Sequence, residues 1–185
     1  MKIVDYNKYA FKIADATITT KGKLKFKYLD TIIDSTGTII PQEVLKRKAT
    51  RVYIMTEDGI IKKIGGSLQK GGIKNTLLMY EGGDAGTPSI SRFNVNNIMK
   101  EGISNNKKYE IYILPVLDTI TITLKGMFTE EVTQVNPSYK ELEALCLKEY
   151  KNIESKYPDW NKQESREVWD VISSNTLPLS TCKRT

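Results

Sequence analysis

The stretch that decides the fold reads RVYIMTEDGIIKKIGGS and spans residues 51–67. Its two halves are apolar and β-branched, and Asp58-Gly59 lies between them. Asp-Gly between such segments is the strongest short signal for a tight β-hairpin. Alternate residues of a strand share a face, so the hairpin is expected to bring Tyr53 and Lys63 to one side. A phenol beside an ammonium is a candidate pair for activating water.

Outside this hairpin the sequence alternates between strand and helix patterns. β-branched residues around Lys21-Gly22-Lys23 predict a second hairpin built from residues 9–20 and 24–33. Helical spacing and capping signals predict helices within 72–80 and over 89–101, 138–156 and 163–172, and alternation predicts strands over 108–114 and 119–124. This mixture of hairpins and helices defines an α+β fold.

The charge balance is basic and the chain has no histidine. Lysine and arginine outnumber aspartate and glutamate by 28 to 22, a formal net charge of +6. Such a surplus favours polyanionic partners, because phosphates gain Coulomb attraction and release counterions on binding. The alternating lysines from Lys21 to Lys27 are expected to form either a surface that follows phosphates or a charged edge strand. The absence of histidine excludes His-based triads, HExxH zinc sites and HNH-type nucleases.

Targeting and redox signals are weak. The sequence contains no apolar run of the 18 residues or so that a membrane-spanning helix needs. Its two cysteines, Cys146 and Cys182, lack metal-type spacing, and Cys146 is expected to be a reduced core thiol. We therefore expect a soluble cytoplasmic protein that does not bind membranes.

The order of several short motifs resembles a known family. RVY at 51–53 is followed by KIG at 63–65, and a late helix carries Lys140-x-x-Glu143-x-x-x-Leu147-x-x-Tyr150. This order resembles the GIY-YIG nuclease superfamily, with RVY in place of GIY and KIG in place of YIG. Within it, the chain is most similar to the small single-domain type II restriction endonucleases in which lysine replaces the tyrosine of YIG.

The resemblance covers roughly residues 49–157 and implies an architecture. It implies a small three-stranded antiparallel sheet flanked by helices, with the N-terminal β-hairpin as an appendage. The expected organisation is an arm over 1–48, a nuclease core over 49–157 and a C-terminal extension over 158–185.

The resemblance also implies a reaction, the hydrolysis of phosphodiester bonds in double-stranded DNA with Mg²⁺ or Mn²⁺. Tyr53 and Lys63 would orient or deprotonate the attacking water, and Lys74 would contact the scissile phosphate. Glu143 is the candidate metal ligand, because one carboxylate with waters and phosphate oxygens suffices for Mg²⁺. A single active site cuts one strand, so double-strand cleavage at a symmetric sequence favours a homodimer.

Two positions depart from the family pattern. Family members have arginine where this chain has Lys74, and the related restriction enzymes have histidine where it has Gly66. Arg92 could supply the missing guanidinium from the next helix. The set of candidate DNA-binding residues comprises Arg51, Lys70, Arg92, Lys21, Lys23 and Lys25.

Two other functions stay open on the sequence alone. The departures at Lys74 and Gly66 also suit a non-catalytic nucleic-acid-binding protein with a degenerate GIY-YIG fold. The third alternative is a basic α+β protein with no nucleic-acid role.

Overall fold

The structure is a computed structural model of the 185-residue chain. It describes residues 1–6, 10–33, 37, 39–40, 45, 51–67, 69–115, 121–125, 131–135 and 139–169. Residues 6, 115, 121–125 and 131–135 are described by their backbone alone.

Both predicted hairpins are confirmed. Strands β5 (Arg51–Glu57) and β6 (Ile60–Ser67) pair antiparallel around a two-residue turn. Asp58 and Gly59 have φ of 50° and 78°, the positive values that such a turn requires and that asparagine, aspartate and glycine adopt most easily. Strands β1 (Phe11–Ile18) and β2 (Leu24–Tyr28) form the N-terminal hairpin.

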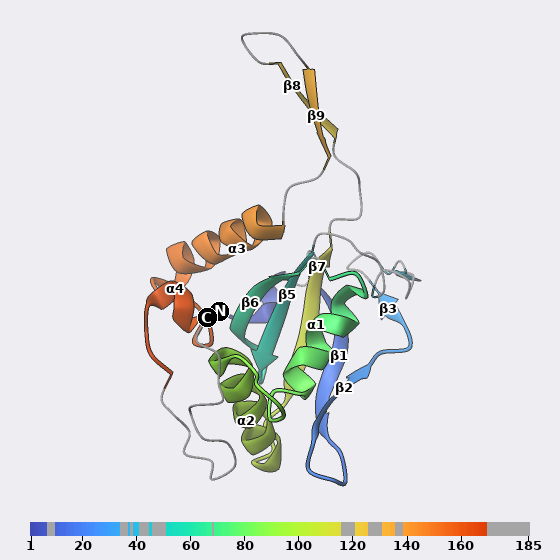
Figure 1. Ribbon diagram of the computed structural model, residues 1–185, viewed down its shortest axis with the longest axis vertical. Coiled ribbons are helices and arrows are strands. Elements are labelled where there is room, and N and C mark those ends of the chain that lie inside the picture. Colours follow the sequence, from blue (N-terminus) through green and yellow to red (C-terminus); the bar gives the residue numbers. More distant parts are fainter. Residues whose placement is uncertain are drawn as a thin grey trace.

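The two hairpins share one sheet, which corrects the prediction of a three-stranded sheet with an appended hairpin. Strand β7 (Tyr109–Pro115) pairs antiparallel with β5 on one side and with β1 on the other. The sheet therefore has five strands in the order β2-β1-β7-β5-β6 (Figure 1). The physical reason is that β7 is buried, with Ile111 and Ile113 fully covered, so its backbone N–H and C=O groups need partners along both edges, and β1 supplies the second set.

Helices cover both faces of this sheet. Helices α1 (Gly72–Glu81) and α2 (Ile90–Ser104) lie in front of it in Figure 1 and close the larger core, which contains Tyr53, Met55 and Leu77. Helix α3 (Tyr139–Glu154) packs against β6 and β5 and closes the smaller core through Leu147 and Tyr150. The three predicted helices within 72–80, over 89–101 and over 138–156 are thus confirmed.

The edge strand β6 is closed by residues 160 and 161 rather than by another strand. Asn161, which is 2 % exposed, donates to the Ile64 carbonyl oxygen at 2.8 Å and accepts from the Ile64 N–H at 2.9 Å. The Trp160 N–H donates to the Lys62 carbonyl oxygen at 2.8 Å. Asn161 therefore satisfies both free backbone groups of Ile64, as a neighbouring strand would.

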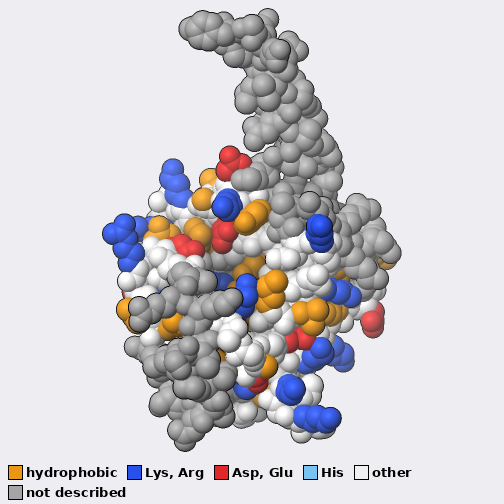
Figure 2. Space-filling view, in the orientation of Figure 1, with side chains coloured by type: hydrophobic (Ala, Val, Ile, Leu, Met, Phe, Trp, Pro, Cys, Tyr) orange, Lys and Arg blue, Asp and Glu red, His pale blue; other side chains and the backbone are white. Residues whose placement is uncertain are grey.

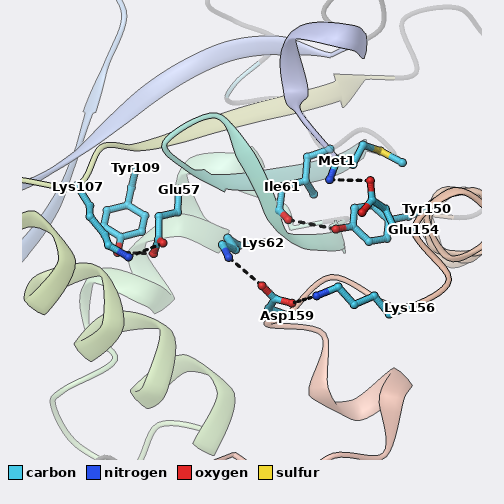
Figure 3. Close-up of polar contacts among 10 residues, drawn as sticks. All are labelled: Met1, Glu57, Ile61, Lys62, Lys107, Tyr109, Tyr150, Glu154, Lys156 and Asp159. Carbon is cyan, nitrogen blue, oxygen red and sulfur yellow. Dashed lines mark hydrogen bonds and ion pairs between the residues drawn. The ribbon is translucent and has the colours of Figure 1, made fainter.

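Ion pairs fix the segment after α3 to β6 (Figure 3). Asp159 accepts from Lys62 at 2.8 Å and from Lys156 at 2.9 Å. The amino group of Met1 pairs with Glu154 of α3 at 2.8 Å. These contacts lock the C-terminal end of α3 onto the sheet, which determines where its N-terminal half can lie.

The remaining elements are small. A 3₁₀ helix, η1, spans Ile3–Tyr6, and β3 (Ile32–Ile33) pairs with β4 (Ile39–Ile40). The predicted strand over 119–124 is β8 (Thr121–Lys125), which pairs with β9 (Glu131–Val135) in a separate two-stranded sheet rather than in the main one.

The helix predicted over 163–172 is shorter than expected. Helix α4 covers only Lys162–Ser165, and residues 170–172 lie outside the described part. Arg166 has φ of 58°, a left-handed conformation that ends a helix. Within the described ranges, no helix combines the length and the apolar character needed to cross a membrane.

Candidate active site

The β5–β6 register decides which side chains meet at the site. Tyr53 lies opposite Gly65 and Met55 lies opposite Lys63, so Tyr53 and Lys63 occupy the same face, as predicted. A Cβ at Gly65 would lie 2.4 Å from both Cζ and Oη of Tyr53. Position 65 therefore requires glycine, because the Tyr53 ring fills the space that any side chain at this position would occupy.

The Tyr53 hydroxyl is paired with a second phenol. Its oxygen lies 2.8 Å from the hydroxyl oxygen of Tyr80 on α1, and the two rings meet edge to face. Burial, followed by Tyr80 and the Glu143 carboxylate, raises the pKa of Tyr53 well above 10, while Arg92 acts in the opposite direction. Tyr53 is therefore a neutral phenol at physiological pH, suited to hydrogen bonding rather than to serving as a resting phenolate base.

Both phenols line an open pocket of about 650 Å³. Arg92, from the first turn of α2, brings a guanidinium to this pocket. The complete lining consists of Tyr53, Gly66, Ser67, Gln69, Lys70, Thr76, Met79, Tyr80, Arg92 and Tyr139. Because the cations outnumber the anions in this lining, the pocket favours a negatively charged ligand.

Glu143 approaches the same pocket from α3. Its carboxylate accepts a hydrogen bond from the Gly66 N–H at the free edge of β6. Burial raises the pKa of Glu143, as does the nearby Glu164, whereas the Gly66 hydrogen bond and Lys63 act to lower it. A Cβ at Gly66 would lie 2.6 Å from Oε2 of Glu143 and 2.6 Å from Cδ2 of Tyr139. Because position 66 is glycine, Glu143 and Tyr139 can occupy the space that a side chain there would fill.

Lys63 and Lys74 have partners other than the two tyrosine hydroxyls. The Lys63 ammonium donates to the Trp160 carbonyl oxygen at 3.4 Å, yet it is close enough to Glu143 to stabilise the carboxylate. The Lys74 ammonium lies 4.5 Å from the centre of the Tyr28 ring on β2, in a cation–π contact. The structure therefore brings Tyr53, Glu143 and Arg92 close together and places Lys74 against Tyr28 of β2.

The other predicted DNA contacts differ in their exposure. Arg51 is only 1 % exposed, so its guanidinium lies in the protein interior. Lys70 is exposed at the rim of the pocket, and Lys21 and Lys23 are exposed at the β1–β2 turn. Lys25 is exposed but pairs with Glu81 at 2.6 Å.

Basic side chains are exposed on the face of the molecule that carries α1 and β2. Figure 2 shows lysine and arginine side chains spread over this face, around the position of α1 and along β2. The pocket opens between α1, α2 and β6 on the same side of the sheet. A polyanion that enters the pocket can therefore also meet the exposed lysines of β2.

Sequence reasoning missed two tyrosines of this site, Tyr80 and Tyr139. Tyr80 lies on the buried face of α1 with Ile73 and Leu77, a spacing that the sequence pattern assigns to core packing. Tyr139 is the first residue of α3 and lies against Gly66. No local signal distinguishes either from a packing residue, because both reach the site only when the helices dock on the sheet.

Comparison with known proteins identifies the fold. No protein-family model matches the chain, and no curated protein matches it in sequence. Among solved structures, a mutant of bacteriophage T4 EndoII superposes with a TM-score of 0.54 over 85 % of this chain and 96 % of that chain, at 11 % identity. Restriction endonuclease HPY188I in complex with product DNA gives a TM-score of 0.41 over 84 % and 81 %, at 18 % identity. The chain therefore shares the fold of phage T4 EndoII.

Proposed function

We propose that this protein is a metal-dependent, sequence-specific DNA endonuclease of the GIY-YIG type that hydrolyses phosphodiester bonds in double-stranded DNA. The observation that carries the proposal is that Tyr53 and Arg92 line one pocket next to the β5–β6 hairpin, while Glu143, bound to the Gly66 N–H at its wall, is close enough to act on Tyr53. The motif order along the chain and the fold shared with phage T4 EndoII support it.

In the proposed reaction a water loses a proton as its oxygen bonds to phosphorus, the bond to the leaving sugar oxygen breaks, and that oxygen takes up a proton, so that one water is added across the P–O bond. Tyr53 orients the water, since a buried neutral phenol can both donate and accept a hydrogen bond. Lys63 supports this arrangement by favouring the ionised form of Glu143, against the burial that raises its pKa. Tyr53 and Lys63 both belong to the β5–β6 hairpin, whose register places their side chains on one face of the sheet.

Arg92 is the proposed contact for the scissile phosphate. Its guanidinium is in the pocket, whereas Lys74 is engaged with the Tyr28 ring. A guanidinium binds two phosphate oxygens with its planar fork, which a lysine ammonium cannot do. Arg92 therefore takes over the role that the family pattern gives to the position of Lys74.

Glu143 is the proposed ligand for Mg²⁺ or Mn²⁺. In the described part of the chain, no three acidic or cysteine side chains form a cluster that could enclose a metal. Mg²⁺ binds through one or two carboxylates together with waters and substrate phosphates, so a single carboxylate beside a phosphate pocket fits it. Burial raises the pKa of Glu143, and the attraction of a cation bound beside the carboxylate would offset this cost of ionisation. A bound metal supplies charge neutralisation at the phosphoryl and leaving oxygens.

The DNA would lie across the α1 and β2 face, and the complete enzyme is proposed to be a homodimer. Lys21, Lys23 and Lys70 are exposed there and can contact phosphates outside the pocket. Two copies related by a two-fold axis would place one pocket on each strand of a symmetric sequence. The expected partner is therefore double-stranded DNA.

The test is cleavage of supercoiled plasmid and of phage DNA by purified protein, with Mg²⁺, with Mn²⁺ and with excess EDTA. Discrete fragments in either metal, and none in EDTA, are the expected result. Sequencing the fragment ends would then give the recognition sequence. Random smears would contradict sequence specificity, and DNA binding without cleavage would favour the non-catalytic alternative.

A salt titration of DNA binding tests the proposed face. Replacing Lys21, Lys23 and Lys70 by glutamine should reduce the slope of log affinity against log salt by about 0.9 for each phosphate that the variant no longer neutralises. The control is the corresponding replacement of Lys148 and Lys151, exposed on α3. Equal slopes in the two variants would remove the α1 and β2 face from the interface.

A further inference from the structure

The hydroxyl pair of Tyr53 and Tyr80 has a role beyond packing. Both side chains are nearly buried, at 6 % and 5 % exposure, and their oxygens lie 2.8 Å apart at the pocket wall. The ring centres are 6.2 Å apart at an interplanar angle of 67°. Packing alone would be served by phenylalanine, so the hydroxyls matter through the hydrogen bond between them.

Helix α1 holds Tyr80 firmly in place. Its buried face packs Ile73 and Leu77 into the larger core, where both are fully buried. The carbonyl oxygen of Tyr80 accepts a hydrogen bond from the Asn96 side chain on α2 at 2.7 Å. Because this hydrogen bond holds the Tyr80 backbone against α2, the Tyr80 hydroxyl has a defined position relative to Tyr53.

The hydrogen bond limits how the Tyr53 hydroxyl can be oriented. Either of the two oxygens can be its donor. In both cases the bond occupies one hydrogen-bonding position of the Tyr53 oxygen and leaves its other positions available to the pocket that Tyr53 lines.

We propose that Tyr80 is a positioning residue whose hydrogen bond to the Tyr53 hydroxyl holds that hydroxyl in place and leaves its remaining hydrogen-bonding positions directed into the pocket, toward the attacking water. This inference rests on the proposed endonuclease function. Tyr80 itself touches neither the water nor the phosphate, and it acts only through Tyr53. Its removal should therefore have no further effect once the Tyr53 hydroxyl is absent.

A double-mutant cycle measures this dependence. Tyr80→Phe should lower kcat about tenfold and leave KM for DNA unchanged, as expected for the loss of one neutral hydrogen bond that matters in the transition state. Tyr53→Phe should lose about 10²–10⁴ in rate, and the double variant should equal Tyr53→Phe. Tyr109→Phe is the control: this phenol is 1 % exposed and donates to Glu57, so the variant should cleave at the wild-type rate.

Nuclear magnetic resonance of protein with isotope-labelled tyrosine Cζ gives a readout that does not depend on cleavage. The Tyr53 signal, assigned by its loss in Tyr53→Phe, should shift in Tyr80→Phe and stay in place in Tyr109→Phe. A Tyr53 signal unmoved by Tyr80→Phe overturns the positioning role, whether or not the protein cuts DNA. Additive rate losses in the double variant overturn it too. If Tyr80→Phe shifts the Tyr53 signal but the wild-type protein does not cleave DNA, the hydroxyl pair is established and only the endonuclease function is contradicted.

Discussion

Replacing Glu143 by glutamine separates the proposed metal site from the fold. Glutamine retains the shape of the side chain and an oxygen that can accept from the Gly66 N–H, but it carries no charge for a metal. A metal at a phosphoryl centre contributes several kcal/mol to the transition state. The expected loss of cleavage is therefore roughly 10³-fold or more, since each 1.36 kcal/mol corresponds to a factor of ten.

Whereas cleavage should fall in Glu143→Gln, its stability and its DNA affinity should stay the same or increase. Burial raises the pKa of Glu143, so the ionised carboxylate destabilises the folded state at neutral pH. Glu143→Gln removes this cost, so the variant should unfold at the same or a higher urea concentration at pH 7. The difference should vanish below the unfolded pKa of about 4.3, where the wild-type carboxyl is protonated in both states. DNA affinity should be equal or at most about fivefold tighter, because the variant no longer repels a phosphate. That repulsion is about 1 kcal/mol for two unit charges about 4 Å apart in water.

The assay combines plasmid cleavage in Mg²⁺, urea unfolding and a DNA-binding titration on the same preparations. Glu141→Gln and Glu149→Gln are the controls, because they lie about 200° and 120° around the helix from Glu143 and are exposed. Both should cleave like the wild type. If Glu141→Gln or Glu149→Gln abolishes cleavage while Glu143→Gln does not, Glu143 is not the metal ligand. Wild-type cleavage in all three variants would refute a single-carboxylate metal site altogether.

Three further perturbations follow from the packing. Gly66→Ala places a Cβ 2.6 Å from Oε2 of Glu143 and should abolish cleavage at a stability cost of about 1–3 kcal/mol. The control Gly82→Ala, whose nearest atom would lie at 3.5 Å, should leave cleavage unchanged. Asn161→Ala leaves an N–H and a carbonyl of β6 without partners and should lower the free energy of unfolding by about 2–4 kcal/mol, measured in urea. Burial alone would raise the pKa of Glu110, but hydrogen bonds from two lysines hold it below its ordinary 4.5. Its stabilisation is thus complete above pH 4.5 and lost as pH falls through the lower folded pKa, so Glu110→Gln should flatten the acid limb of a thermal unfolding series.

The local elements were predictable because their causes lie within a few residues. Asp58-Gly59 can adopt the positive φ values of a tight turn, and the alternation on either side sets the register that puts Tyr53 and Lys63 on one face. Helical spacing likewise located α1, α2 and α3 to within a few residues. The order of motifs along the chain directed attention to Glu143.

The assembly of these elements depends on contacts between residues far apart in the sequence. Nothing local indicates that β7 joins the two hairpins into five strands, because an edge strand and a central strand differ only in what lies beside them. The same limit applies to Tyr80, whose hydroxyl meets Tyr53 only when α1 docks on the sheet. It applies also to Arg92 in the pocket and to Lys74 on the Tyr28 ring. The sequence by itself determined the hairpins, the helices and the residue types of the site. Only the tertiary structure decided which cations line the pocket and which phenol supports Tyr53, because helix docking sets the direction of each side chain.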